Sequence, residues 1–169
     1  MVVRIDNTHP YNFGDPPKKE YIKGAASACW KASRKRLKYC EYLLAVYEDK
    51  IVDAFKIENK FYHDEVLENK IELQNHIKYP SFRKYEIEAH ACKTPEEIKE
   101  KLGEHISIFK KVVKVDIDNP KEFSNWKKRC FLILKDCDNE NLNSLAGESL
   151  PYKTISNKFR SHTYYNLEV

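Results

Sequence analysis

The fold of this chain is decided by residues 42–57, which have the sequence Tyr42-Leu43-Leu44-Ala45-Val46-Tyr47-Glu48-Asp49-Lys50-Ile51-Val52-Asp53-Ala54-Phe55-Lys56-Ile57. Two apolar runs rich in β-branched and aromatic side chains are separated here by three polar residues, a pattern that predicts a β-hairpin. The first run is apolar on both faces and therefore indicates a central strand. In the second run, alternation places Asp53 on the same face as Ile51 and Phe55, so one carboxylate interrupts an apolar face.

The residues around this hairpin predict further short elements. Ser33 can cap a helix that continues to Cys40. Leu67 and Ile71 have the spacing of one apolar helix face within residues 64–76. Alternating or short continuous apolar runs predict strands over residues 83–90, 108–117 and 129–135, and residues 120–126 predict a turn or one helical turn.

The clearest helix signal lies in residues 94–103. Thr94 is a good N-cap, Pro95 occupies the first helical position and Glu97 completes a capping box. Gly103 follows as a stop signal. We therefore expect a short, well-defined helix between Thr94 and Gly103.

Together these elements predict an α+β fold. Strands and long helices do not alternate regularly, so we expect a curved, mostly antiparallel sheet or a small open β-barrel with short helices packed around it. A length of 169 residues without a Gly/Ser-rich linker indicates one domain over residues 1–169. We expect residues 1–20 to be an N-terminal arm or loop, and residues 142–169 to be less regular, with a short helix followed by coil or an edge strand.

The composition limits the class of protein. No segment approaches the ~20 apolar residues of a membrane span, and residues 1–17 lack the apolar run of a signal peptide, so we expect a cytoplasmic protein. Five irregularly spaced cysteines indicate reduced thiols. The net charge of +4 is too small to hold the protein to nucleic acid by itself, so local clusters of charge matter more.

Two such clusters join an indole to several cations. Lysine and arginine displace counterions from phosphates, and aromatic faces stack on unpaired bases, so this combination predicts a nucleic-acid interface for DNA or RNA. The alternative is that the tryptophans belong to the core and the cations to a solvated face. The candidate binding residues are Trp30, Lys31, Ser33, Arg34, Lys35, Arg36, Trp126, Lys127, Lys128 and Arg129.

A magnesium-dependent nuclease is the enzymatic alternative. Asp53, or Asp49, could hold the ion with Glu58, while Lys60 orients the attacking water. The same Glu-x-Lys spacing recurs elsewhere, as expected in a chain rich in these residues. No catalytic signature stands out, so we expect a non-enzymatic protein, and a protein-interaction domain of a phage or host-defence factor is the third hypothesis.

We expect neither a metal site nor a cofactor. His90 and Cys92 lie two residues apart at the end of a predicted strand, where their side chains share a face. A structural zinc site needs four ligands, usually as two close pairs, and no second pair with suitable spacing occurs.

One segment resembles a known group of domains. Trp30-Lys31-Ala32-Ser33 and Arg36 precede the hairpin runs 42–47 and 51–55, and this stretch, about residues 24–60, resembles PUA-like modules, the group that includes EVE, YTH and ASCH domains. The resemblance implies a compact β-barrel that reads RNA, or DNA with a modified base, in an aromatic-lined pocket beside a basic surface, often in company with restriction or defence nucleases. It makes Trp30, Arg34 and Arg36 the residues to test. The segment from Lys60 to Pro80 and the long tail depart from the pattern.

Overall fold

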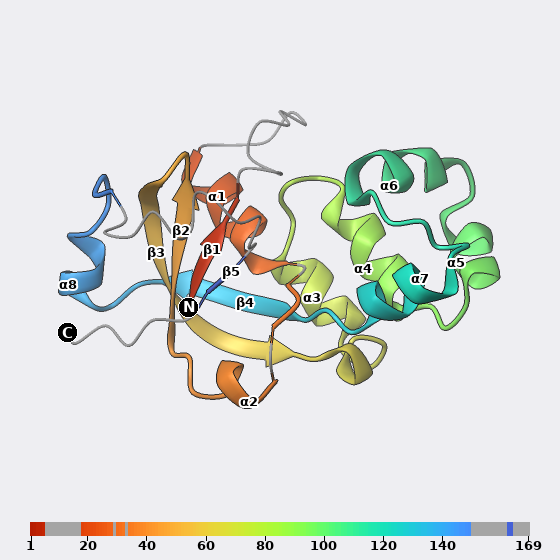
Figure 1. Cartoon of the computed structure of the whole chain (residues 1–169), viewed down its shortest axis with the longest axis horizontal. Coiled ribbons are helices and arrows are strands. Elements are labelled where there is room, and N and C mark those ends of the chain that lie inside the picture. Colours follow the sequence, from red (N-terminus) through yellow and green to blue (C-terminus); the bar gives the residue numbers. More distant parts are fainter. Residues whose placement is uncertain (6–17, 29, 33, 150–161, 164–169) are drawn as a thin grey trace.

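A mixed sheet forms the centre of the protein. The computed structural model describes residues 1–5, 18–28, 30–32, 34–149 and 162–163, and in this part of the chain five strands are ordered β4-β3-β2-β1-β5 (Figure 1). The strands are β1 (Val2–Arg4), β2 (Tyr42–Tyr47), β3 (Lys50–Phe61), β4 (Phe131–Asp136) and β5 (His162–Thr163). Only the β1–β2 pair among these strands is parallel. The sheet is open, and the predicted α+β class with mostly antiparallel pairing is confirmed.

The predicted hairpin is β2 and β3. Glu48 and Asp49 form the tight turn between them, with φ of 49° and 66°. Positive φ at both central residues matches the right-handed twist of paired strands. Strand β4 confirms the strand predicted over residues 129–135 and pairs with the far half of β3.

A β-bulge changes the predicted faces of β3. Val46 pairs with Ile51 but Ala45 pairs with Asp53, so Val52 is the extra residue. As a result, Ile51 packs with Leu44 on one side of the sheet, whereas Phe55 packs in the cluster on the other side. The prediction that Ile51, Asp53 and Phe55 share one face is wrong, because the bulge shifts the alternation by one residue.

The first residues form more than an arm. β1 lies inside the sheet between β2 and β5, and helix α1 (Lys18–Ser27) packs on the sheet face that carries Phe55. The prediction of a loop or arm over residues 1–20 is therefore wrong at both of its ends. The turn-rich stretch 9–17 and the predicted cap Ser33 lie outside the described residues.

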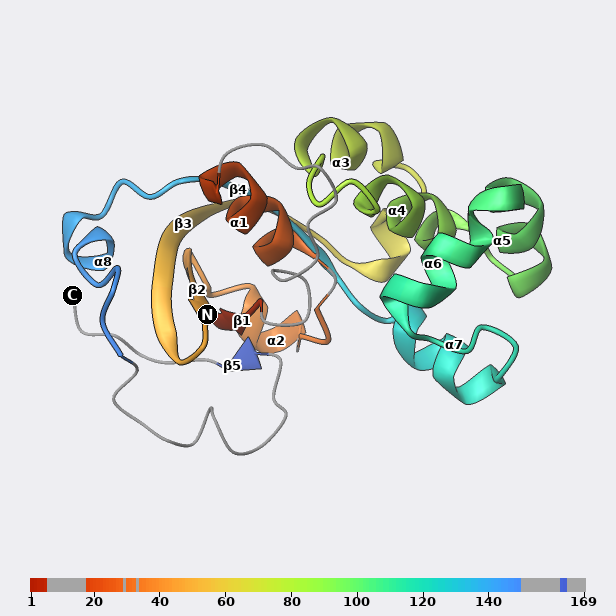
Figure 2. The same ribbon diagram turned by 90° about the horizontal axis from the view of Figure 1, so that it is seen from above.

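A helical insertion connects β3 to β4. It contains η1 (His63–Glu65), α3 (Lys70–His76), α4 (Arg83–Ala91), α5 (Pro95–Leu102), η2 (Gly103–His105), α6 (Ile106–Val113) and α7 (Pro120–Lys127). Figures 1 and 2 both show these helices gathered at one end of the sheet. Their own core centres on Trp126, Phe109 and Ile98, all at most 1% exposed.

Two predicted strands are helices. Residues 83–90 lie in α4, and most of residues 108–117 lie in or directly after α6. In α4 the side chains of Arg83, Ile87 and His90 are all buried, at spacings of four and three residues. Those spacings mark one helix face, so a sequence that alternates over a few residues can also satisfy the helical period.

The helix predicted over residues 64–76 is correct only in part. A 3₁₀ turn comes first and α3 begins at Lys70. Leu67 and Ile71 are 55% and 72% exposed, while Leu73 and Ile77 are buried, so the predicted apolar face is wrong. The buried face is formed instead by Val66, Leu73 and Ile77, which are spaced by seven and four residues.

The capping signals of α5 were accurate. In α5 the Thr94 hydroxyl accepts a hydrogen bond from the Glu97 amide at 3.2 Å, and Gly103 follows with φ of 52°. The Glu97 carboxylate accepts from the Lys93 amide at 2.8 Å, one residue before the expected partner. Two short helices complete the structure, α2 (Arg34–Leu37) before β2 and α8 (Glu140–Asn143) after β4.

Candidate nucleic-acid interface

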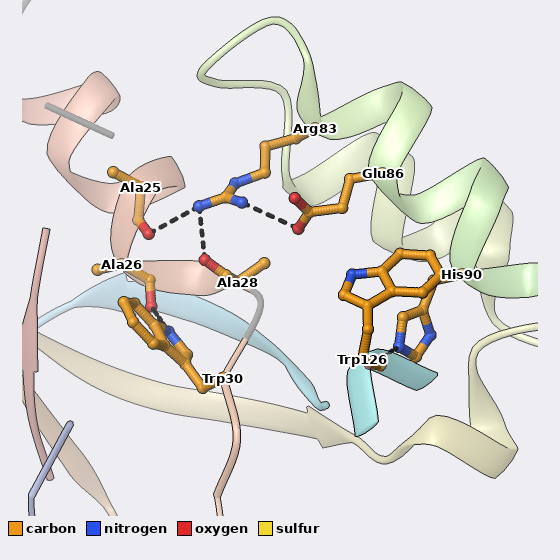
Figure 3. A network of polar contacts seen from close by, with 8 residues as sticks. All are labelled: Ala25, Ala26, Ala28, Trp30, Arg83, Glu86, His90 and Trp126. Atoms are coloured by element: carbon orange, nitrogen blue, oxygen red, sulfur yellow. Dashed lines mark hydrogen bonds and ion pairs between the residues drawn. The ribbon is translucent and has the colours of Figure 1, made fainter. Parts of the chain in front are cut away.

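Trp30 is a core residue. Its side chain is 7% exposed and packs against α1 and the sheet, and its indole Nε1 donates a hydrogen bond to the Ala26 main-chain oxygen at 2.7 Å (Figure 3). An indole in this position keeps its polar atom satisfied while its faces contact apolar side chains. Trp30 therefore has no exposed face on which a base could stack.

Trp126 is more deeply buried. It is 1% exposed and forms edge-to-face contacts with His90 and Phe109, at centroid distances of 4.8 and 5.5 Å. Its Nε1 has no hydrogen-bond partner among the described residues. Both tryptophans thus follow the alternative considered for them, core packing, and the predicted stacking role of these two side chains is not compatible with their burial.

The two basic clusters nevertheless meet. Trp30 and Cys130 form an antiparallel bridge in which each amide donates to the other residue's carbonyl, at 3.0 and 2.9 Å. Because the bridge is antiparallel, Lys31, which follows Trp30, lies opposite Arg129, which precedes Cys130. Since neighbouring residues in extended chains point to opposite sides, these two cations leave the buried side on which Trp30 and Cys130 lie.

Arg34 and Lys127 contact other elements of the fold. Arg34 lies 3.5 Å from the Asp64 carboxylate and 3.7 Å from that of Glu65, with its guanidinium 4.2 Å from the centre of the Tyr62 ring. The Lys127 ammonium donates to the main-chain oxygens of His90 and Cys92, the latter at 2.6 Å, at the end of α4. Arg34 therefore connects α2 with η1, and Lys127 connects the end of α7 with the end of α4.

The remaining cations face solvent. Lys31, Lys35, Arg36 and Lys128 are exposed, and Arg129 is half-buried. Ser33 lies outside the described residues. The predicted interface thus keeps most of its charge but loses both of its indoles.

Tyr39 supplies an exposed aromatic ring that the candidate list lacked. It lies in the turn after α2 and is 76% exposed, the largest value among the exposed large hydrophobic residues in the described part of the chain. The Lys38 ammonium lies 4.6 Å from its ring centre, and the Lys60 ammonium donates to the Lys38 main-chain oxygen at 3.1 Å. The sequence signal that could have added Tyr39 to the candidates was its position directly after Arg36, Leu37 and Lys38.

The residues of the nuclease alternative are separated along one strand. Asp53 and Glu58 are five positions apart in β3, roughly 17 Å at the rise of an extended chain. The Asp53 carboxylate accepts from the Ala54 amide at 2.8 Å, and Glu58 is the extra residue of a second bulge. One ion cannot contact both carboxylates, because its ligands lie within about 2–2.6 Å of it.

The other possible ligands do not gather either. His90 is fully buried with Nε2 3.2 Å from the Trp126 main-chain oxygen, and the Cys92 thiol donates to the Glu88 main-chain oxygen at 3.3 Å. Burial raises the pKa of the Cys92 thiol. Within the described residues there is no group of three or more His, Cys, Asp or Glu side chains placed to hold a metal ion.

Comparison with known proteins gives no relative. No protein-family model matches the chain, and no curated protein and no solved structure is significantly similar to it. Within the described residues, no helix is long and apolar enough to cross a membrane.

Proposed function

We propose that the protein binds nucleic acid through the α2 surface, which we define as Lys31, Lys35, Arg36, Lys38 and Tyr39. The observation that carries this proposal is the exposed tyrosine ring at the end of a run of exposed cations. Such a surface offers positive charge to phosphates and one π-face to a base. Arg129 extends the charge beyond Lys31 across the bridge between Trp30 and Cys130.

The affinity of the α2 surface for nucleic acid is limited by nearby acidic side chains. Arg34 belongs to the same helix, but its charge is already paired with Asp64 and Glu65. Affinity would then depend mainly on the exposed lysines, which predicts modest binding that weakens as salt rises. DNA and RNA both present the required phosphates.

The resemblance to PUA-like modules supports the same surface. A short basic helix leads directly into the β2–β3 hairpin, which is the order of elements on which the resemblance rests. Trp30 is not available as a pocket wall because it is buried, so a modified-base reader linked to restriction or defence would need Tyr39 in that role. Matched oligonucleotides with and without one methylated base test this form of the proposal.

Salt-dependent binding is the decisive test. The double variant Lys35→Ala/Lys38→Ala should weaken binding of a fluorescein-labelled oligonucleotide regardless of its sequence, measured by anisotropy. The slope of log K against log salt should become smaller by about 2, because two phosphate contacts are lost. Binding that is absent from the wild-type protein, or that does not depend on salt, would refute the proposal.

Lys110→Ala/Lys111→Ala is the matched control. These two exposed lysines lie on α6 in the helical insertion. Replacing both of them removes the same amount of positive charge as the α2 double variant. Figures 1 and 2 show α6 well separated from α2. Equal losses in both double variants would mean that the overall charge, and not the α2 surface, governs binding.

A further inference from the structure

The α2 surface also indicates which form of nucleic acid it suits. We infer that its ligand is a single strand, with one unpaired base stacked on Tyr39 and the neighbouring phosphates beside Lys35 and Lys38. This inference rests on the proposed function and specifies its substrate class. Three features of the surface support it: the exposure of the ring, its position in the turn after α2 and the hydrogen bonds that hold this turn.

The Tyr39 ring projects from the protein. Leu37 is fully buried and holds α2 against the core, whereas Lys35 in α2 and Tyr39 in the turn after it are exposed. With 76% of the residue exposed, the ring has a free face even though the Lys38 ammonium lies 4.6 Å from its centre. A planar base can approach that face without any rearrangement of the fold.

The turn that carries the ring is fixed by two hydrogen bonds to main-chain oxygens. The Tyr39 amide donates to the Arg36 oxygen at 3.2 Å, and the Lys60 ammonium of β3 donates to the Lys38 oxygen at 3.1 Å. The turn that carries Tyr39 is therefore held to strand β3 of the sheet. A platform that is already in place loses little conformational entropy when a base stacks on it.

Duplex nucleic acid does not offer the same contact. In a duplex the base faces are stacked on one another and only their edges are accessible in the grooves. A single strand exposes base faces, and the exposed lysines of the same surface can meet the phosphates that flank the stacked base. The aromatic contact therefore adds affinity for single strands only, whereas the lysines contact either form.

The experiment compares a 12-nucleotide single strand with the duplex of the same sequence, by fluorescence anisotropy. The wild-type protein should bind the single strand at least tenfold more tightly. Tyr39→Ala should weaken single-strand binding roughly tenfold or more and leave duplex binding unchanged, while Tyr39→Phe, which keeps the ring, should behave as wild type. The salt slope should be the same in all three proteins, because no charge is altered.

The outcomes separate this inference from the proposed function. Equal affinity for the single strand and the duplex, or unchanged single-strand binding by Tyr39→Ala, would overturn the inference and leave the nucleic-acid proposal intact. Absence of binding to both forms would overturn the proposed function as well. An exposed ring can be removed without unfolding the protein, and an unchanged thermal midpoint for Tyr39→Ala verifies this.

Discussion

At the scale of single residues, Gly24 shows how one missing side chain permits the packing of two segments. A Cβ atom at this position would lie 1.7 Å from the Tyr79 main-chain oxygen, which belongs to the connection between α3 and α4. We expect Gly24→Ala to lower the free energy of unfolding by about 3 kcal/mol, because backbone must move to relieve the clash. Urea unfolding followed by circular dichroism measures this.

The neighbouring variant Lys23→Ala serves as the control for Gly24→Ala. Lys23 is on the same helix and partly exposed, so its truncation should change the free energy of unfolding by less than about 0.5 kcal/mol. Similar changes in the free energy of unfolding for the two variants would show that the main chain at Tyr79 does not lie against Gly24 of α1.

His90 makes stability depend on pH. Burial lowers its pKa to about 3, with the positive charge of Lys127 adding to the effect, and its Nδ1 has no hydrogen-bond partner among the described residues. Below about pH 6.5 the unfolded chain binds a proton at this histidine while the folded protein does not. The free energy of unfolding should therefore decrease as the pH is lowered, by about 1.4 kcal/mol per pH unit between about pH 6 and 3.

The variant His90→Gln isolates this contribution. The difference in unfolding free energy between wild type and His90→Gln should shrink steadily as pH falls through that range, measured by urea unfolding at several pH values. His76→Gln, which removes a surface histidine from α3, is the control. A difference that is constant from pH 7 to 4 would contradict the burial of a neutral His90.

At the scale of secondary-structure elements, Arg83 joins the helical insertion to the helix on the sheet. From the start of α4 its guanidinium donates to the Glu86 carboxylate at 2.9 Å and to the Ala25 oxygen of α1 at 3.0 Å, and it also contacts the Ala28 oxygen (Figure 3). Both side chains of the ion pair are at most 5% exposed. The cation also satisfies carbonyl groups at the end of α1 that have no partner within the helix.

We expect Arg83→Met to cost about 3–5 kcal/mol of unfolding free energy, because it leaves the buried Glu86 carboxylate without a counter-charge. The double variant Arg83→Met/Glu86→Gln should be less destabilised than Arg83→Met alone. Chemical denaturation of the three proteins provides the comparison.

The half-exposed pair Lys70 and Glu88 offers a control for this prediction. Its atoms are 3.1 Å apart between α3 and α4, and Lys70→Met should cost no more than about 1 kcal/mol. If Arg83→Met costs as little as Lys70→Met, the buried pair does not hold the insertion to the sheet.

At the scale of the whole molecule, the helical insertion brings the distant basic stretches together. Trp30 and Cys130 are 100 positions apart, and the chain between them passes through the hairpin and then the helices of the insertion before it returns as β4. The return creates the bridge that places Arg129 next to Lys31. The α2 surface therefore continues onto a segment that is remote in sequence.

Local interactions explain which elements were predictable from the sequence. The β2–β3 hairpin, strand β4 and the capped helix α5 depend on turn residues, side-chain type and hydrogen bonds between near neighbours. The identity of α4 was not predictable in this way, because a short alternating run fits a strand and a helix equally well until its partners are known.

Side-chain type and order along the chain thus determined the α+β class, the central hairpin and the existence of two clusters of cations with aromatic residues. Tertiary structure alone decided which members of those clusters reach solvent. It buried Trp30 and Trp126, engaged Arg34 and Lys127 in the fold and left Tyr39 exposed. The physical reason is that a hydrogen-bonded turn or cap is made by neighbours in sequence, whereas the exposure of a side chain depends on which distant segment covers it.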